Sequence, residues 1–224
     1  MATFTIVHGG WGGGWEWRDV EMLLRARGHG VTRPTLTGLG ERAHLLSPSV
    51  DLDTHVEDVV RHLEFEGLQD VVLCGHSYGG MVVTGVADRV PARITQLVYV
   101  DGFVPREGES LLDLLPAEWV SMVRDSATDG RVPPPGEDPA YPPWYVERVR
   151  HHPLAAFEQP LRLSGRGDAI PRSYIRCLQS DAPLASSIER ARSAGWTMLE
   201  IAAQHDAQVD DPVGLAELLS AAAS

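Results

Sequence analysis

Ser77 lies in a pattern that can make a serine hydroxyl reactive. Residues 71–80 read VVLCGHSYGG, so a run of apolar, strand-forming residues leads into Gly-x-Ser-x-Gly, and a helix-compatible run, 81–88, follows. This order of strand, sharp turn and helix holds the serine in a strained conformation, with its hydroxyl exposed at the edge of a sheet. Gly75 and Gly79 leave room for the turn because they have no side chains. We therefore expect Ser77 to be a nucleophile.

His205 is the candidate base. A serine hydroxyl is a weak nucleophile until a neighbouring base takes its proton. In this arrangement the chain order is serine, acid, histidine, and the histidine follows the last strand. Of the nine histidines, His205 alone follows the strand expected at 196–202 and precedes the closing helix. We expect it to accept the proton of Ser77.

An acid must hold the imidazole in the right tautomer, and three aspartates are candidates. Asp181 follows the strand expected at 173–178, and a loop there would bring its carboxylate beneath His205. Asp101 follows the preceding strand, and Asp168 lies in a Gly-rich turn. We expect Asp181 to be the acid, with Asp101 as the first alternative.

Two backbone N–H groups are expected to bind the negative oxygen that forms when a serine attacks a carbonyl group. The Tyr78 N–H lies at the start of a helix, whose dipole favours negative charge. A second donor comes from the glycine-rich loop 9–14, where the backbone can approach a substrate closely. Such a loop could instead cradle a phosphate, but it has neither a Gly-Lys-Ser/Thr ending nor a Gly-x-Gly-x-x-Gly pattern. We assign the oxyanion hole to the Gly10 and Tyr78 amides and expect Gly9 and Trp11 to line the pocket.

Strand-forming runs alternate with amphipathic helical segments, as in a parallel sheet covered on both faces. Strands are expected at 3–8, 31–36, 71–74, 94–100, 173–178 and 196–202, and helices at 15–27, 54–66, 81–88 and 210–222. Thr54 and Glu57 have the spacing of a capping box at the start of the second helix. The predicted fold is α/β, a mostly parallel six-stranded sheet with helices on both faces.

The alternation breaks after Phe103, and residues 104–168 are expected to form a cap inserted into a single domain that comprises the whole chain, 1–224. Proline runs and short amphipathic pieces fill this segment, and strand signals resume after it. Trp119 and Trp144 are candidates for the wall of the substrate pocket, although either could pack inside the cap instead.

Composition excludes several classes of partner. The formal net charge of −12 at pH 7 opposes binding to nucleic acid or to an anionic membrane surface, since both need clustered Lys and Arg. No segment approaches the ~18–20 apolar residues of a membrane span, and the first strand leaves no room for a signal peptide.

Cys74 and Cys177 lie in apolar, strand-like runs and are expected to be buried thiols, which favours the cytoplasm. His151-His152 lacks a third ligand at metal spacing, so we expect an exposed pair and no metal site.

Together these features resemble the α/β-hydrolase superfamily, and within it the branch of plant methyl esterases, hydroxynitrile lyases and their bacterial esterase relatives. The resemblance is carried by HGGW at 8–11, GLGER at 38–42, GHSYGG at 75–80, the inserted cap and His205, and it covers nearly the whole chain. It implies that the acid lies in the loop that contains Asp181, in agreement with the choice made above.

The lyases of this branch differ from the chain at two positions. They have a threonine directly after the first-loop histidine and a lysine directly after the catalytic histidine, where this chain has Gly9 and Asp206. The cation that would stabilise a leaving cyanide is thus replaced by an anion, and cyanohydrin cleavage is not expected.

The expected function is a serine carboxylic ester hydrolase that works through an acyl-enzyme, without a cofactor, on a methyl ester, aryl ester or lactone of a small apolar or aromatic substrate. The alternative is a biosynthetic lyase or cyclase that uses His205 for elimination or proton abstraction, which the fold alone does not exclude. A non-catalytic binding protein is disfavoured, because it need not keep a complete triad. A small molecule is the expected partner, and a homodimer stays open.

Overall fold

Six parallel strands form the central sheet of the computed structural model, which describes residues 1–135 and 141–223. Their order is β2-β1-β3-β4-β7-β8, and every neighbouring pair is parallel. The strands are β1 (Thr3–Val7), β2 (Gly30–Thr32), β3 (Val71–His76), β4 (Ile94–Val100), β7 (Arg172–Cys177) and β8 (Thr197–Ile201). All six predicted strands are present, although β2 is shorter than expected. The predicted α/β fold is confirmed.

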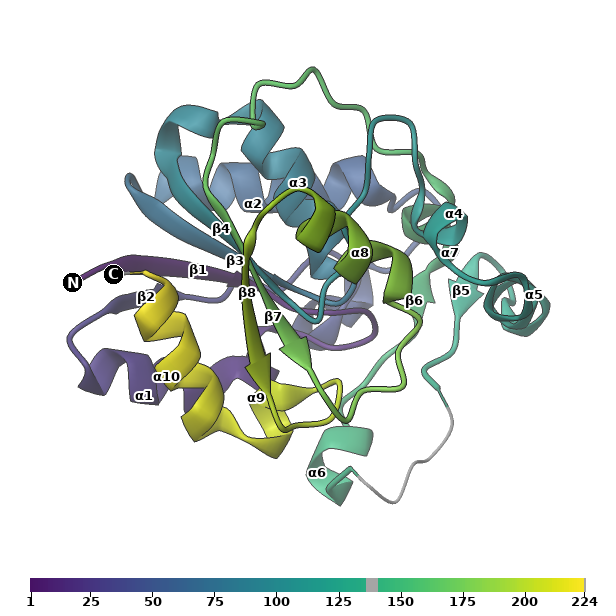
Figure 1. The fold of residues 1–224 in the computed structure, drawn as a ribbon. Coiled ribbons are helices and arrows are strands. Elements are labelled where there is room, and N and C mark those ends of the chain that lie inside the picture. The colour runs from purple at the N-terminus through teal and green to yellow at the C-terminus, as the bar shows by residue number, and fades with distance from the viewer. Residues whose placement is uncertain (136–140, 224) are drawn as a thin grey trace.

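Helices cover both faces of this sheet (Figure 1). On one face α1 (Arg18–Ala26) packs against α10 (Pro212–Ala222), and on the other lie α2 (Leu52–Phe65), α3 (Gly79–Arg89) and α8 (Ala185–Ser193). The shorter elements are α9 (Ala207–Asp210) and the 3₁₀ helices η1 (Gly14–Trp17), η2 (Gly40–Leu45) and η3 (Pro91–Arg93). Among the helices of residues 1–135 and 141–223, none combines the length and the apolar character that a membrane crossing requires.

Side chains of the central strands alternate between two cores, as a sheet covered on both faces requires. Leu73 of β3 and Leu97 of β4 are partners across the two strands, and both face the core under α2 and α3. Val72 and Val98 face the opposite core, which also contains Trp17. With both faces covered, the strand ends are where this sheet can present functional groups.

Helix α2 begins earlier than the predicted capping pattern. Its N-cap is Asp51, whose carboxylate accepts hydrogen bonds from the Thr54 N–H (2.9 Å) and the Thr54 hydroxyl (2.7 Å). The start at Leu52 also places this apolar side chain in the core. The predicted capping box of Thr54 and Glu57 is therefore wrong, because Thr54 is the third residue of the helix and Asp51 caps it.

The segment between β4 and β7 packs beside the sheet as a cap, on the side of the molecule opposite the two chain termini (Figure 1). Its elements are α4 (Leu111–Leu114), α5 (Ala117–Ser126), β5 (Arg131–Val132), α6 (Pro143–Val146), β6 (His152–Pro153) and α7 (Leu154–Glu158). β5 and β6 pair antiparallel, with Val132 opposite His152. The predicted amphipathic pieces at 111–115 and 119–123 coincide with α4 and α5, whereas no signal in the sequence indicated β5, β6 and α7. Residues 136–140 of the predicted cap lie outside the described residues.

Two predictions about burial have different outcomes. Cys74 and Cys177 are buried free thiols, as predicted. His151 is exposed, but His152 is completely buried, so the predicted exposed pair is wrong for His152. The physical reason is a contact across the cap, because the His152 ring stacks on buried Phe157 and its Nδ1 accepts a hydrogen bond from the Trp11 N–H.

The carboxylate of Asp88, at the end of α3, anchors the chain where it returns from the cap to the sheet. It accepts hydrogen bonds from the Ser164 N–H (2.8 Å), the Ser164 hydroxyl (2.9 Å) and the Arg166 N–H (2.9 Å). Three donors therefore depend on one side chain that is 9% exposed.

We expect Asp88→Ala to lower the free energy of unfolding by about 1–3 kcal/mol, because it leaves these donors without their acceptor. Urea unfolding followed by circular dichroism measures this. Asp125→Ala, at an exposed position of α5, is the matched control. Equal midpoints for the two variants would show that the Asp88 contacts do not stabilise the fold.

Candidate active site

Ser77 occupies the sharp turn between β3 and α3. Its φ is 51°, in the left-handed region that residues with a Cβ rarely adopt. Its N–H donates to the Val100 carbonyl (3.3 Å), which ties the turn to the end of β4. A Cβ on Gly75 would lie 2.6 Å from the Gly79 carbonyl oxygen, and a Cβ on Gly79 would lie 2.6 Å from a carbonyl oxygen of β1. The predicted strand–turn–helix arrangement is present, and these two glycines make its close packing possible.

His205 lies in the loop after β8, and its hydrogen-bond partner is Asp101. His205 Nδ1 and Asp101 Oδ2 are 2.8 Å apart. The other oxygen of Asp101 accepts a hydrogen bond from the Cys177 N–H (3.2 Å), so the carboxylate is held at two points. Because a carboxylate only accepts, Nδ1 of His205 carries the proton and Nε2 is left as an acceptor. This is the tautomer that a base acting on a serine hydroxyl needs.

The prediction that Asp181 partners His205 is wrong, and the position belongs to the alternative, Asp101. Asp181 is exposed in the loop between β7 and α8, and the side chain of Asp168 is 78% exposed. Asp101 follows β4 directly, is 1% exposed and has a φ of 40°. It thus makes a left-handed turn at the end of a central strand, as Ser77 does at the end of the neighbouring strand.

His76, next to Ser77, links the serine turn to the histidine loop. Its Nε2 lies 3.0 Å from the His205 carbonyl oxygen, and the two ring centroids are 4.7 Å apart. Burial, and next the nearby His205, lowers the pKa of His76 to about 4, so this ring is neutral and donates from Nε2. Burial also lowers the pKa of His205, but the hydrogen bond to Asp101 and the charges of Asp206 and Asp101 hold that pKa above its ordinary value of 6.5.

His8 orients the peptide group between Gly9 and Gly10. Its Nε2 accepts from the Leu36 N–H (3.1 Å), which leaves Nδ1 to donate to the Gly9 carbonyl (2.8 Å). Burial lowers the pKa of His8 to about 3, so the ring stays neutral. In a trans peptide the carbonyl and the next N–H point in opposite directions, so this bond turns the Gly10 N–H away from His8. Among the described residues, neither the Gly10 N–H nor the Tyr78 N–H has an acceptor, and both are available to a ligand oxygen.

The side chain of Tyr78 is anchored in the core by His55, a contact that the sequence did not reveal. His55 Nε2 lies 2.9 Å from the Thr37 carbonyl oxygen and therefore carries the proton. His55 Nδ1 then accepts the hydrogen bond of the Tyr78 hydroxyl (2.8 Å). Tyr78 is 1% exposed. Its hydroxyl is held by His55 and its backbone belongs to the serine turn, so the residue that presents its N–H beside Ser77 has little freedom to move.

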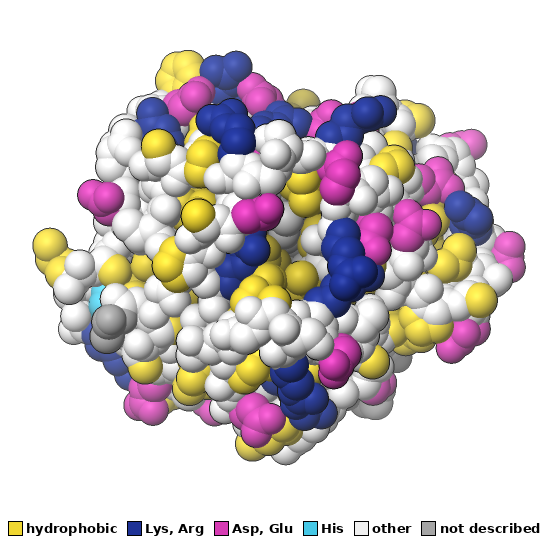
Figure 2. Space-filling model, turned by 45° about the horizontal axis from the view of Figure 1, so that its top comes forward, with side chains coloured by type: hydrophobic (Ala, Val, Ile, Leu, Met, Phe, Trp, Pro, Cys, Tyr) yellow, Lys and Arg dark blue, Asp and Glu magenta, His cyan; other side chains and the backbone are white. Residues whose placement is uncertain are grey.

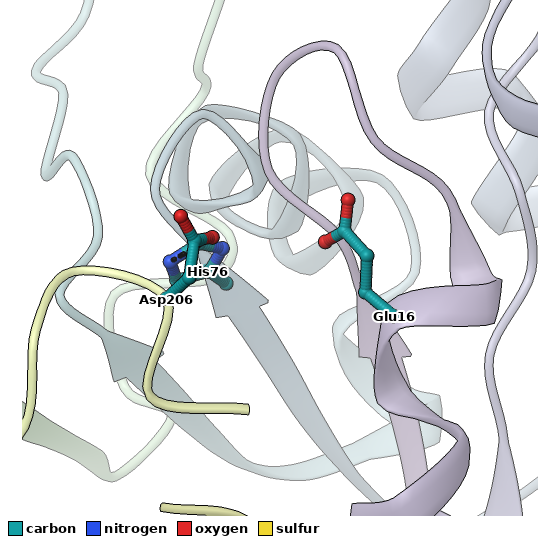
Figure 3. A group of neighbouring side chains, drawn as sticks. All are labelled: Glu16, His76 and Asp206. Atoms are coloured by element: carbon teal, nitrogen blue, oxygen red, sulfur yellow. Dashed lines mark ion pairs between the residues drawn. The ribbon is translucent and has the colours of Figure 1, made fainter. Parts of the chain in front are cut away.

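Two buried carboxylates and His76 lie close together behind the histidine loop (Figure 3). Oxygens of Glu16 and Asp206 and a ring nitrogen of His76 lie within 4.8 Å of one another. The Gln208 amide donates to both carboxylates, and the Tyr141 hydroxyl donates to Asp206. Burial, together with the charge of Asp206, raises the pKa of Glu16 well above its ordinary value. Burial opposes the charge of Asp206 as well, but His76, His205 and the hydrogen bonds from Tyr141 and Gln208 hold the pKa of Asp206 below its ordinary value.

The spacing of these three groups is compatible with a metal ion, but their hydrogen bonds do not fit one. His76 Nε2 donates to the His205 carbonyl oxygen and has no lone pair for a cation. The N–H donors of Gln208 point at both carboxylates, where a cation would need acceptors. The cluster is a hydrogen-bond network that holds the Asp206 carboxylate, and Asp206 directly follows His205 in the chain.

The four residues predicted to line the pocket have different surroundings. Gly9 is buried against the serine turn, where a Cβ would lie 3.1 Å from the Ser77 Cβ. Trp11 is half-buried among rings of the cap. Trp119 is half-buried on α5, and Trp144 is 41% exposed on α6, where its ring contacts Trp15. Of the four, Gly9 lies against the serine turn and Trp11 packs between the glycine loop and the cap.

The described residues also line two hollows away from the serine. One, of about 800 Å³, lies over α2 and includes none of Ser77, Asp101 and His205. The other, of about 300 Å³, lies between β7 and α8 and reaches Asp101 and Cys177.

On the face seen in Figure 2, dark blue cationic side chains alternate with magenta acidic ones around exposed hydrophobic side chains, without a continuous basic surface. These cations are all Arg, because the sequence contains no Lys.

Comparison with known proteins gives matches over the whole chain. Residues 6–218 match the family described as "Alpha/beta hydrolase family". The chain is 41% identical over 242 aligned positions to a carbendazim hydrolyzing esterase of Nocardioides sp. (strain SG-4G), with 99% of each chain covered. It is 35% identical to Methylesterase 9 of Arabidopsis thaliana over 47% of this chain and 41% of that one. An extracellular alpha/beta-hydrolase from a Paenibacillus species, similar to tobacco salicylic acid binding protein 2, superposes with a TM-score of 0.89 at 26% identity, and 99% of each chain is covered.

Asp101→Asn should lower kcat for ester hydrolysis by up to ~10⁴, because an amide can present its N–H to Nδ1 and stabilise the wrong tautomer of His205. KM should change little, since the pocket remains. Asp181→Asn, at an exposed position, should leave kcat within about threefold of the wild type. Steady-state kinetics of the two folded variants decide between the aspartates, and the reverse ranking would restore Asp181.

The pH dependence of kcat/KM should also change. His205 must be unprotonated to act as a base, so kcat/KM should rise with pH through a pKa above 6.5 in the wild type. In the residual activity of Asp101→Asn this limb should move to lower pH, because the carboxylate that favours the charged imidazole is gone. A limb at the same pH in both proteins would mean that Asp101 does not control this titration.

Proposed function

The chain belongs to the alpha/beta hydrolase family and is an enzyme, and we propose that it hydrolyses small carboxylic esters through Ser77. One observation carries the proposal: the 2.8 Å hydrogen bond between Asp101 and His205, in a loop that His76 ties to the serine turn. The N–H groups of Gly10 and Tyr78, which have no acceptor in the described part of the chain, give a place for the oxyanion.

In the proposed reaction His205 Nε2 takes the proton of the Ser77 hydroxyl while its oxygen attacks the ester carbonyl. The Gly10 and Tyr78 N–H groups stabilise the oxyanion that forms. His205 then gives the proton to the leaving alkoxide, and the alcohol departs from an acyl-enzyme. A water molecule, deprotonated by His205, attacks the acyl group and releases the carboxylic acid and free Ser77. Asp101 stabilises the imidazolium in both halves of the reaction.

We propose a methyl ester, aryl ester or lactone with an apolar or aromatic group as the substrate class. The aromatic side chains around the glycine loop support this, since Trp11 packs with Phe157 and with His152 of the cap. The names of two relatives, a carbendazim hydrolyzing esterase and Methylesterase 9, are consistent with esters of this kind. Two buried free thiols fit a reducing compartment such as the cytoplasm.

Cyanohydrin cleavage does not fit the residues at this site. The position after His205 holds Asp206, which is 8% exposed and accepts hydrogen bonds from Tyr141 and Gln208. An ionised carboxylate would repel a leaving cyanide, and the sequence has no lysine to take its place. We therefore expect no cyanide release from mandelonitrile above the background rate, measured colorimetrically. Cyanide release that disappears in Ser77→Ala would contradict this assignment.

Ser77→Ala should keep the fold and lower hydrolysis of p-nitrophenyl acetate and aryl methyl esters by several orders of magnitude, as the loss of a triad nucleophile does. A fluorophosphonate should modify the wild type at Ser77, detected by peptide mass spectrometry, and should leave the variant unmodified. Undiminished turnover by folded Ser77→Ala would overturn the acyl-enzyme mechanism and favour the alternative in which His205 acts as the base of a lyase.

A further inference from the structure

The cap holds one residue of the glycine loop, Trp11, by all of its polar groups. The Trp11 N–H donates to His152 Nδ1 (3.2 Å). Its carbonyl accepts from the Arg150 N–H (2.8 Å), and its indole N–H donates to the Val132 carbonyl (3.2 Å). Trp11 has a φ of 62°, a conformation that its own backbone preferences oppose. The cap therefore supplies the contacts that keep this residue in place.

His152 has the properties of a permanent hydrogen-bond acceptor. It is 0% exposed and stacks on Phe157, with the ring centroids 4.1 Å apart. Burial, and next the nearby His55 and His8, lowers its pKa well below the ordinary value, so the ring is neutral. Nδ1 accepts from Trp11, so Nε2 carries the hydrogen, and among the described residues Nε2 has no partner. Packing alone would favour a phenylalanine here, because a buried N–H without an acceptor costs stability.

The two peptide groups that flank Gly10 are held from opposite sides. His8, at the end of β1, fixes the carbonyl of the peptide between Gly9 and Gly10. The peptide between Gly10 and Trp11 is fixed by His152 at its N–H and by the Gly12 N–H at its carbonyl (2.7 Å). The two peptide planes meet at the Cα of Gly10, whose φ and ψ are less restricted than those of other residues. Contacts on both planes are therefore needed to hold Gly10, and with it the Gly10 N–H, in one position.

We infer that His152 is a positioning residue of the oxyanion hole, through which the cap sets the direction of the Gly10 N–H. The inference rests on the proposed function, in which this N–H stabilises the oxyanion. It also gives the cap a task in the chemical step, beyond enclosing the substrate. Loss of the acceptor should let the Gly10–Trp11 peptide rotate, and an oxyanion donor is effective only when it is aimed at the oxygen.

Two substitutions separate the acceptor from the ring. His152→Phe keeps an aromatic ring against Phe157 but has no acceptor for the Trp11 N–H. His152→Asn loses the ring but can place its Oδ1 where Nδ1 lies, because both atoms are bonded to Cγ. We expect His152→Phe to lower kcat/KM for p-nitrophenyl acetate about 10- to 100-fold, mainly through kcat. We expect His152→Asn to be less stable to heat but to recover most of kcat.

A trifluoromethyl ketone reports on the oxyanion hole directly, because it forms a tetrahedral anion with the serine. Its inhibition constant should rise in His152→Phe by the same factor by which kcat/KM falls, and should stay near the wild-type value in His152→Asn. The opposite ranking, with His152→Phe active and His152→Asn impaired in both measurements, would show that His152 serves packing and would overturn the inference.

Two readouts keep this test separate from that of the proposed function. The Trp11 amide signal in a ¹⁵N–¹H spectrum reports the hydrogen bond without catalysis, and it should shift and exchange faster in His152→Phe than in His152→Asn. An unchanged signal in His152→Phe overturns the inference whatever the activity. If a fluorophosphonate modifies Ser77 of the wild type but the wild type hydrolyses no ester, the proposed function fails. The rate of that modification then replaces kcat/KM, and an equal rate in all three proteins overturns the inference.

Discussion

Backbone strain at the carboxyl edge of the sheet is the constraint on which the site depends. Three residues without the freedom of glycine have positive φ at this edge: Trp11 at 62°, Ser77 at 51° and Asp101 at 40°. They follow β1, β3 and β4, which are neighbours in the sheet. Each such conformation costs about 1–3 kcal/mol and persists only where surrounding contacts enforce it. Each of these turns therefore has a specific restraint, and the restraints differ.

The serine turn is enforced by close packing, the aspartate turn by the sheet and the tryptophan turn by the cap. Around Ser77 the backbone of α3 approaches β1 so closely that Gly79 could not carry a side chain. At Asp101 the N–H donates to the Ile175 carbonyl (2.8 Å), which continues the ladder of β4 and β7 beyond the strand, while the carboxylate binds Cys177 and His205. The proposed reaction needs an oriented nucleophile, an oriented base and an oriented oxyanion donor. Each of these depends on a different one of the three turns, and all three turns lie at the same edge of the sheet.

The sequence predicts the strands of the sheet well, but it predicts the catalytic residues at the carboxyl edge of the sheet only in part. Strands such as Ile94–Val100 are runs rich in β-branched and apolar residues between turn residues, so their bounds can be read directly. Gly-x-Ser-x-Gly identifies Ser77 because its chemistry and its turn are encoded in five adjacent residues. The choice between Asp101 and Asp181 is different, because both end strands and only the path of the backbone decides which carboxylate turns toward His205. Helix α8 was not predicted because only Ser187 and Ala191 of it are buried, too few for a helical period.

The burial of His152 could not be predicted for a related reason, since a two-residue strand has no pattern of its own. Its importance comes from Trp11, which is 141 positions away in the sequence. Contacts of this range depend on how the cap folds back on the sheet, which local sequence does not encode.

The use of Asp101 as the partner of His205 also has an evolutionary consequence. His205 and Asp101 both follow strands of the sheet. The loop at 178–184 and the start of α8 therefore contribute no residue to the proposed catalytic triad. Side chains at the exposed positions 178, 179 and 181 of this loop can change with little penalty, and this segment already borders a hollow of about 300 Å³ next to Asp101. A lineage could reshape this side of the molecule, and even acquire a second recognition surface, without rebuilding its catalytic residues. The active site and its surroundings can therefore diverge at different rates.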